Sequence, residues 1–115
     1  MFDEQKKLNY WQSILGLDDW DIKVKVIKQC EFCWCEDASG EVKYNFIHKE
    51  ALIHLLNPEE FKNPDFKYDI EKTLVHELLH CKFAIIEKEE QINDITHQLI
   101  DEIAKSMIKL KRRIK

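Results

Sequence analysis

The segment that most constrains the fold is residues 69–86, an apolar run with helical periodicity. Placed on a helix, its large apolar residues cover one side and a second flank, which leaves only a narrow polar stripe. The first side holds Ile70, Leu74, Leu78, Cys81 and Ile85, the second flank Val75, Leu79 and Ile86, and the stripe Thr73, His76, Glu77 and His80. A helix that is apolar nearly all round is buried, so we expect the stripe to lie inside the protein or along a cleft.

The rest of the chain predicts a small sheet with further helices. The segment "DWDIKVKVIK" alternates apolar and charged residues, as in a half-buried strand, and the two Asn-Pro pairs within residues 57–65 suit helix starts. We expect a helix over residues 3–16, strands at 19–28, 31–36, 41–47 and 51–56, a helix that ends near 85, and a last helix from about 87 to 112. This order predicts one α+β domain over residues 1–115, with a largely antiparallel sheet and helices on one of its faces.

Charge and hydropathy exclude several classes of function. The net charge of −4 gives no electrostatic reason to expect nucleic acid, and no apolar run approaches the ~20 residues of a membrane span. Because no secretory signal is visible, we expect a soluble, cytoplasmic protein with reduced thiols. Cys30, Cys33 and Cys35 lie close together, but no second cysteine pair follows, so a second metal site or a redox role is a weaker alternative to thiols partly in the core.

The polar stripe has the spacing of a metal site. Histidines one turn apart on one helix face, as in "HELLH", can both bind one zinc ion. A zinc ion polarises a carbonyl and lowers the pKa of a bound water towards about 7, and the neighbouring Glu77 is placed to act as general base. The alternative is a helix whose histidines form only local hydrogen bonds.

A catalytic zinc site also needs a third protein ligand. The candidates after the motif are Glu87, Glu89, Glu90, Asp94, His97, Asp101 and Glu102. A turn near residues 84–87 would bring residues 89–91 level with His80. A wheel of the last helix predicts an inward face of Ile92, Ile95, Thr96, Leu99, Ile103, Met107 and Leu110. Glu89 falls at the margin of that face, whereas Glu90, Asp94 and His97 point roughly the opposite way. Glu89 is therefore the preferred ligand, with Glu90 and His97 as alternatives.

"HELLH" followed by "EEQINDITHQLI" resembles short intracellular gluzincin-type metallopeptidases, and looks closest to phage-associated and repressor-cleaving members of the ImmA/IrrE type. In that group a glutamate opens a pattern on the next helix. Seven positions match it in register, of which the second and fifth carry larger residues than the small ones usual there: Glu89, Ile92, Asn93, Ile95, Thr96, Leu99 and Ile100. The resemblance covers residues 73–100 and implies a zincin-like fold, with His76, His80 and Glu89 as zinc ligands and Glu77 as general base. A SprT-like pattern would make His97 the ligand, but the H-G-x-x-F context of that family is absent, and so is the metzincin spacing.

The expected function is that of a zinc-dependent endopeptidase acting on a protein or peptide, which by the resemblance would be a regulatory protein. Two alternatives remain: a zinc-containing binding module that cleaves nothing, and an interaction protein without metal. A peptidase also needs a donor for the developing oxyanion, for which Tyr44, Tyr68, His54 and His97 are the candidates.

Overall fold

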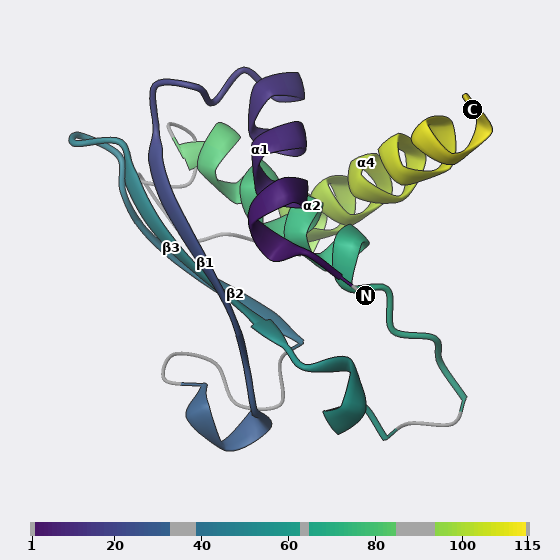
Figure 1. Ribbon diagram of the computed structural model, residues 1–115. Coiled ribbons are helices and arrows are strands. Elements are labelled where there is room, and N and C mark those ends of the chain that lie inside the picture. The colour runs from purple at the N-terminus through teal and green to yellow at the C-terminus, as the bar shows by residue number, and fades with distance from the viewer. Residues whose placement is uncertain (1, 33–38, 63–64, 85–93, 115) are drawn as a thin grey trace.

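The computed structural model describes residues 2–32, 39–62, 65–84 and 94–114, with side chains in the last range from His97 onward. Its elements, labelled in Figure 1 where there is room, are the helices α1 (Glu4–Ile14), α2 (Ile70–Lys82) and α4 (Asp94–Arg113), the strands β1 (Asp21–Ile27), β2 (Gly40–Asn45) and β3 (Glu50–Leu56), and the 3-10 turns η1 (Gln29–Glu31) and η2 (Pro58–Glu60). The predicted α+β class is confirmed.

The sheet is mixed, so the prediction of a largely antiparallel sheet is wrong. Its strand order is β1-β3-β2: β3 pairs with β1 in parallel and with β2 in an antiparallel ladder. Although β1 and β2 follow one another in the chain, β3 lies between them. The apolar run of β3 fits this central place, because five of its seven residues are buried. A strand buried on both faces reads as nearly continuous apolar sequence, whereas alternation marks a half-exposed strand such as β1.

The predicted strand at residues 31–36 is not observed where the structure describes it. Gln29–Glu31 form a 3-10 turn closed by a reciprocal cap, in which the backbone N–H of Lys28 donates to the Glu31 carboxylate at 2.8 Å. Residues 33–38 lie outside the described residues. After β3, Asn57 caps η2 as the Asn-Pro pattern predicts, its side chain accepting from the backbone N–H of Glu59 at 3.0 Å.

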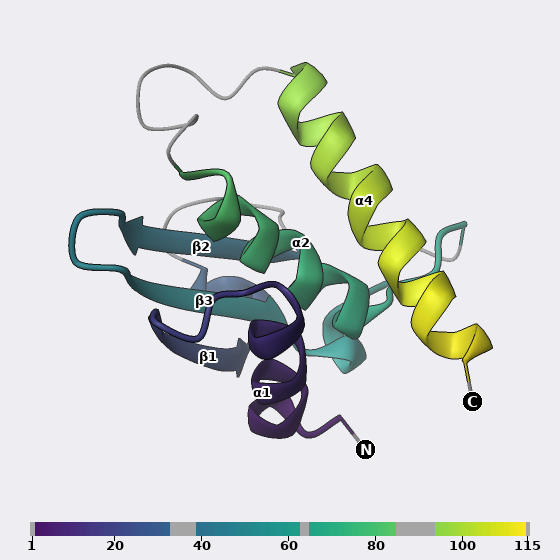
Figure 2. The ribbon, with the colours of Figure 1, turned by 90° about the horizontal axis from the view of Figure 1, so that it is seen from above.

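The helices pack on one face of the sheet in two layers. Helix α2 contacts β2 and β3, α1 contacts β1 and α2, and α4 packs on α2. Figures 1 and 2 show α2 between the sheet and α4. The core between these layers contains the fully buried side chains of Leu8, Trp11, Ile53, Leu55, Leu74, Leu78 and Ile100. No helix in the described part of the chain is both long and apolar enough to cross a membrane.

A buried polar contact ties the helices together. The Trp11 indole N–H donates to Oε2 of Glu71 at 2.7 Å, and Lys111 near the end of α4 donates to the same oxygen. Glu71 lies in the first turn of α2, so this carboxylate joins α1, α2 and α4. The N-terminal end of α2 is thereby fixed.

Candidate metal centre

Helix α2 carries the "HELLH" motif and is buried, as its sequence pattern predicts. Its start is capped by Asp69, whose side chain accepts from the backbone N–H of Lys72 at 3.2 Å. The apolar sides of the helix are in the core, with Leu74, Val75, Leu78, Leu79 and Cys81 all at most 3% exposed. The polar stripe is buried with them: Thr73, Glu77 and His80 are each below 9% exposed, and only His76 is partly accessible.

Three histidines converge beside this helix. The ring centroids of His76 and His80 lie 5.1 Å apart, and His97 from α4 lies 5.1 Å from His80 and 6.4 Å from His76. Each ring offers a nitrogen, and the three nitrogens lie within 4.8 Å of one another. A tetrahedral zinc ion with nitrogen ligands at 2.0–2.1 Å needs them about 3.4 Å apart, a difference that modest side-chain rotation covers. The group could therefore hold a metal ion.

The orientation of α4 decides this geometry, and it differs from the predicted one. The buried stripe of the helix is Ile100, Ala104 and Ile108, whereas Leu99 and Leu110, which the wheel placed inward, are 50% and 57% exposed. His97 lies one turn before Ile100 and Asp101, on the edge of the buried stripe, so it faces α2. The prediction that His97 points away from the motif is wrong.

The preferred third ligand, Glu89, and its alternative Glu90 lie outside the described residues. Their role stays a prediction. Within the part of the chain that the structure describes, His97 is the residue of α4 that joins His76 and His80 in a ligand-like group.

Glu77, the predicted general base, lines a small pocket that His76 also lines. The pocket has a volume of about 210 Å³ and is lined by Ser39, Gly40, Lys72, Thr73, His76, Glu77 and Asp101. Gly40 begins β2 and closes one wall, because a β-carbon there would lie 2.5 Å from Cγ2 of Thr73 and 3.0 Å from Oε2 of Glu77. The absence of a side chain at Gly40 allows the strand to approach the carboxylate.

Burial favours the neutral form of His76. Burial and the neighbouring His80 lower the pKa of His76 to about 4, against the opposing effect of Asp101. The Asp101 carboxylate, although burial acts in the other direction, has its pKa held below the usual range by hydrogen bonds from Lys72 and Lys105. At neutral pH the site thus presents a neutral imidazole, which is the form that binds a metal, beside an ionised carboxylate.

Burial alone does not demand a metal here. Every buried side-chain nitrogen and oxygen among the described residues has a hydrogen-bond partner within the protein. The case for a metal therefore rests on the convergence of three imidazoles.

Two of the proposed oxyanion donors are engaged elsewhere. The Tyr68 hydroxyl donates to the backbone carbonyl of Leu56 at 2.8 Å, and burial raises its pKa. His54 pairs through Nδ1 with the Glu41 carboxylate at 2.7 Å, on the sheet face that carries Lys23 and Lys43. Tyr44 packs edge-on against Trp20, and its ring lines a different hollow. The Tyr68 hydroxyl also lies 3.3 Å from the carbonyl oxygen of Ser39, which lines the pocket of Glu77, so Tyr68 and His97 are the two candidates near the motif.

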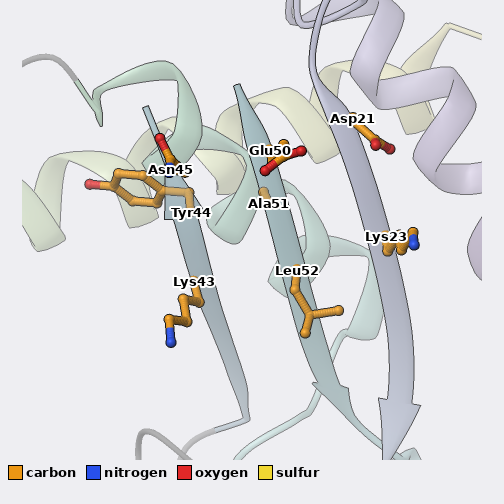
Figure 3. A pocket seen from close by; sticks show the side chains of 8 residues that line it. All are labelled: Asp21, Lys23, Lys43, Tyr44, Asn45, Glu50, Ala51 and Leu52. Carbon is orange, nitrogen blue, oxygen red and sulfur yellow. The ribbon is translucent and has the colours of Figure 1, made fainter. Parts of the chain in front are cut away.

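A larger hollow lies on the sheet, away from the motif residues. It has a volume of about 450 Å³ and is lined by Asp21, Lys23, Lys43, Tyr44, Asn45, Glu50, Ala51 and Leu52 (Figure 3). Lys23, Leu52 and Lys43 project from the three strands, with Asp21 and Glu50 at the other end of the hollow. Its lining contains no histidine or cysteine. His76 and Glu77 of the motif line the smaller pocket instead.

The cysteines do not form a second centre among the described residues. Cys30 is exposed on η1, and Cys81 is buried on α2 in the core. Cys33 and Cys35 lie outside the described residues, so their proposed roles stay predictions.

No family model, curated protein or solved structure matches the chain.

Sequence reasoning did not single out three residues at the site: Gly40, Lys72 and, as a neighbour of His76, Asp101. Asp101 was a candidate ligand only because it is acidic. Its spacing from His97, one helical turn, was the available signal, because residues so spaced share a face. Gly40, one of two glycines in the chain, lies between the predicted strands at 31–36 and 41–47, where a glycine is typical of a turn.

Proposed function

We propose that this chain is a zinc-dependent metallopeptidase whose metal is held by His76, His80 and His97. The observation that carries the proposal is the meeting of these three imidazoles beside the buried Glu77. Three neutral histidine ligands suit zinc among the common divalent ions. Zinc bound there would supply a Lewis acid for the substrate carbonyl and an acidified water.

The residues of the chain would perform the remaining steps. Glu77 follows His76 directly on α2 and lines the same pocket as His76. It is therefore placed to accept the proton of the attacking water and to deliver it to the leaving amine. The partly exposed His76 and the exposed His97 leave the site open to a substrate.

The substrate would be an extended segment of a protein. β2 is an edge strand of the sheet, and its first residue, Gly40, lies against Glu77. An extended peptide that adds to the outer edge of β2 would pass the pocket. In so small a domain few elements remain to form deep subsites, which favours a flexible segment of a protein as substrate. The resemblance to repressor-cleaving peptidases implies that this protein would be a regulatory one.

Elemental analysis and a Glu77→Gln variant test this function. The wild-type protein is expected to contain one zinc per chain, and to cleave members of a random-sequence peptide library with products detected by mass spectrometry. Glu77→Gln keeps the three histidines, so it should retain zinc and fold while losing cleavage. A wild-type protein without stoichiometric metal contradicts the proposal. Products that are the same from both proteins would contradict the role of Glu77 and favour a zinc-containing binding module.

Two further variants identify the third metal ligand. His97→Ala is expected to weaken zinc binding strongly, whereas Glu89→Gln should leave the zinc affinity within a few-fold of wild type. The reverse result would mean that Glu89, and not His97, is the third metal ligand.

A further inference from the structure

Asp101 reaches the metal centre from α4. Its Oδ1 lies 2.8 Å from Nζ of Lys72 and 3.4 Å from Nδ1 of His76, both on α2. Its Oδ2 lies 3.4 Å from Nζ of Lys105, one turn further along α4. The carboxylate is therefore held from both helices, and His97 lies one turn before it.

The contact with His76 places a carboxylate at one of the two imidazole nitrogens, Nδ1. A carboxylate paired with two lysines is ionised and can only accept hydrogen bonds. If His76 binds a metal through Nε2, its Nδ1 carries the proton and faces this carboxylate. A distance of 3.4 Å is long for a hydrogen bond, as is common at sites whose bonds shorten when the ligand binds.

We propose that Asp101 is the positioning residue of the centre, and that its carboxylate sets the tautomer and ring orientation of His76. This inference rests on the proposed metal site, and it assigns a role to a residue that belongs to no part of the "HELLH" motif. Carboxylates that hold metal-binding histidines in this way typically contribute 10–100-fold to metal affinity.

A purely structural role for Asp101 is a separate possibility, because α4 also carries His97. Docking of α4, however, is provided by the buried Ile100, Ala104 and Ile108. The exposed Lys105 and partly exposed Lys72 form ion pairs that contribute little to stability. Removing the Asp101 carboxylate should thus leave α4 in place and act on His76.

Zinc affinity, measured by competition with chromogenic chelators, tests the proposal without any substrate. Asp101→Ala is expected to bind zinc 10–100-fold more weakly than wild type. Asp101→Asn keeps an oxygen acceptor and should recover part of the loss. Glu102→Ala is the matched control, because Glu102 is the adjacent acidic residue of α4, is exposed and contacts Gln98 on the same helix. The absorption spectrum of bound Co²⁺ should change in Asp101→Ala and remain unchanged in Glu102→Ala.

Double variants separate positioning of His76 from docking of His97. If Asp101 acts through His76, Asp101→Ala should weaken zinc binding further in a His97→Ala background and have no added effect in a His76→Ala background. The opposite pattern, or wild-type affinity in Asp101→Ala and Asp101→Asn, overturns the proposal. An equal loss in Glu102→Ala also overturns it. Wild-type protein that binds no zinc overturns the proposed function as well, whereas the other negative results leave that function intact.

Discussion

Gly40 on β2 and Glu77 on α2 approach so closely that a β-carbon on Gly40 would lie 3.0 Å from Oε2 of the glutamate. The same atom would lie 2.5 Å from Cγ2 of Thr73, a distance that real side chains do not reach. The backbone of Gly40 has no positive φ, so the requirement for glycine is one of space rather than of backbone conformation. The sheet and the motif helix thus meet at Glu77, the proposed general base.

Replacing Gly40 with alanine should displace the pocket wall. Because Thr73 or the strand must shift, we expect a loss of about 1–3 kcal/mol in the free energy of unfolding. Cleavage should fall further than zinc affinity, since Glu77 is contacted and the histidines are not. Urea denaturation, zinc competition and peptide cleavage measure the three quantities, with Ser39→Ala as the neighbouring control. A Gly40→Ala protein as stable and active as wild type would show that the strand is further from α2 than described.

Metal removal should destabilise the domain. Zinc at about 100 times its dissociation constant stabilises a folded protein by about 2.7 kcal/mol, which for a domain of this size is a shift of about 10–20 °C in Tm. We expect EDTA to lower the Tm of the wild-type protein, and to leave that of the His76→Ala/His80→Ala double variant unchanged. Differential scanning calorimetry measures both. An interaction protein without metal would show the same Tm with and without the chelator.

The orientation of α4 can be tested by paired truncations. Ile100 is fully buried and Leu99 is half exposed, although the two are adjacent and similar in size. Ile100→Ala is expected to cost about 2–5 kcal/mol of stability, and Leu99→Ala less than about 1 kcal/mol. Chemical denaturation distinguishes them. A larger effect at Leu99 would support the predicted inward face of α4, in which His97 points away from the motif.

The buried face of α4 differs from the predicted one, and the reason shows what the sequence could not decide. Apolar residues occupy two adjoining stripes of the helix: the large side chains of Leu99, Ile103 and Leu110, and the stripe of Ile100, Ala104 and Ile108. A wheel favours the larger residues. Packing favours the stripe with Ala104, whose small side chain lets the helix approach α2, and Ala104 is fully buried. Both choices satisfy the periodicity, so only the tertiary contact decides between them.

The motif helix was predictable for the opposite reason. Its apolar residues cover nearly the whole circumference, so one narrow polar stripe was left and its burial followed from the pattern. Strand order was not predictable, because alternation reports which face is buried and not which strand is the neighbour. The long apolar run of β3 was the available sign of a central strand.

Acid should destabilise the domain through Glu71. Burial alone would raise the pKa of this carboxyl, but hydrogen bonds from Lys111 and Trp11 hold the folded-state pKa below its ordinary value. The resulting stabilisation is fully present above the pKa of the unfolded chain. It is lost as the pH falls through the lower, folded-state pKa, where the unfolded chain has already bound the proton.

A Glu71→Gln variant isolates this contribution. At pH 7 it should be less stable than wild type by about 1–3 kcal/mol, because the lysine and indole partners lose a charged acceptor. Between neutral pH and about pH 3, its free energy of unfolding should decrease less than that of the wild-type protein. Urea denaturation across this pH range measures both slopes. Equal slopes would mean that Glu71 has the same pKa in the folded and unfolded chains. The contact that joins α1, α2 and α4 would then not stabilise the ionised form of Glu71.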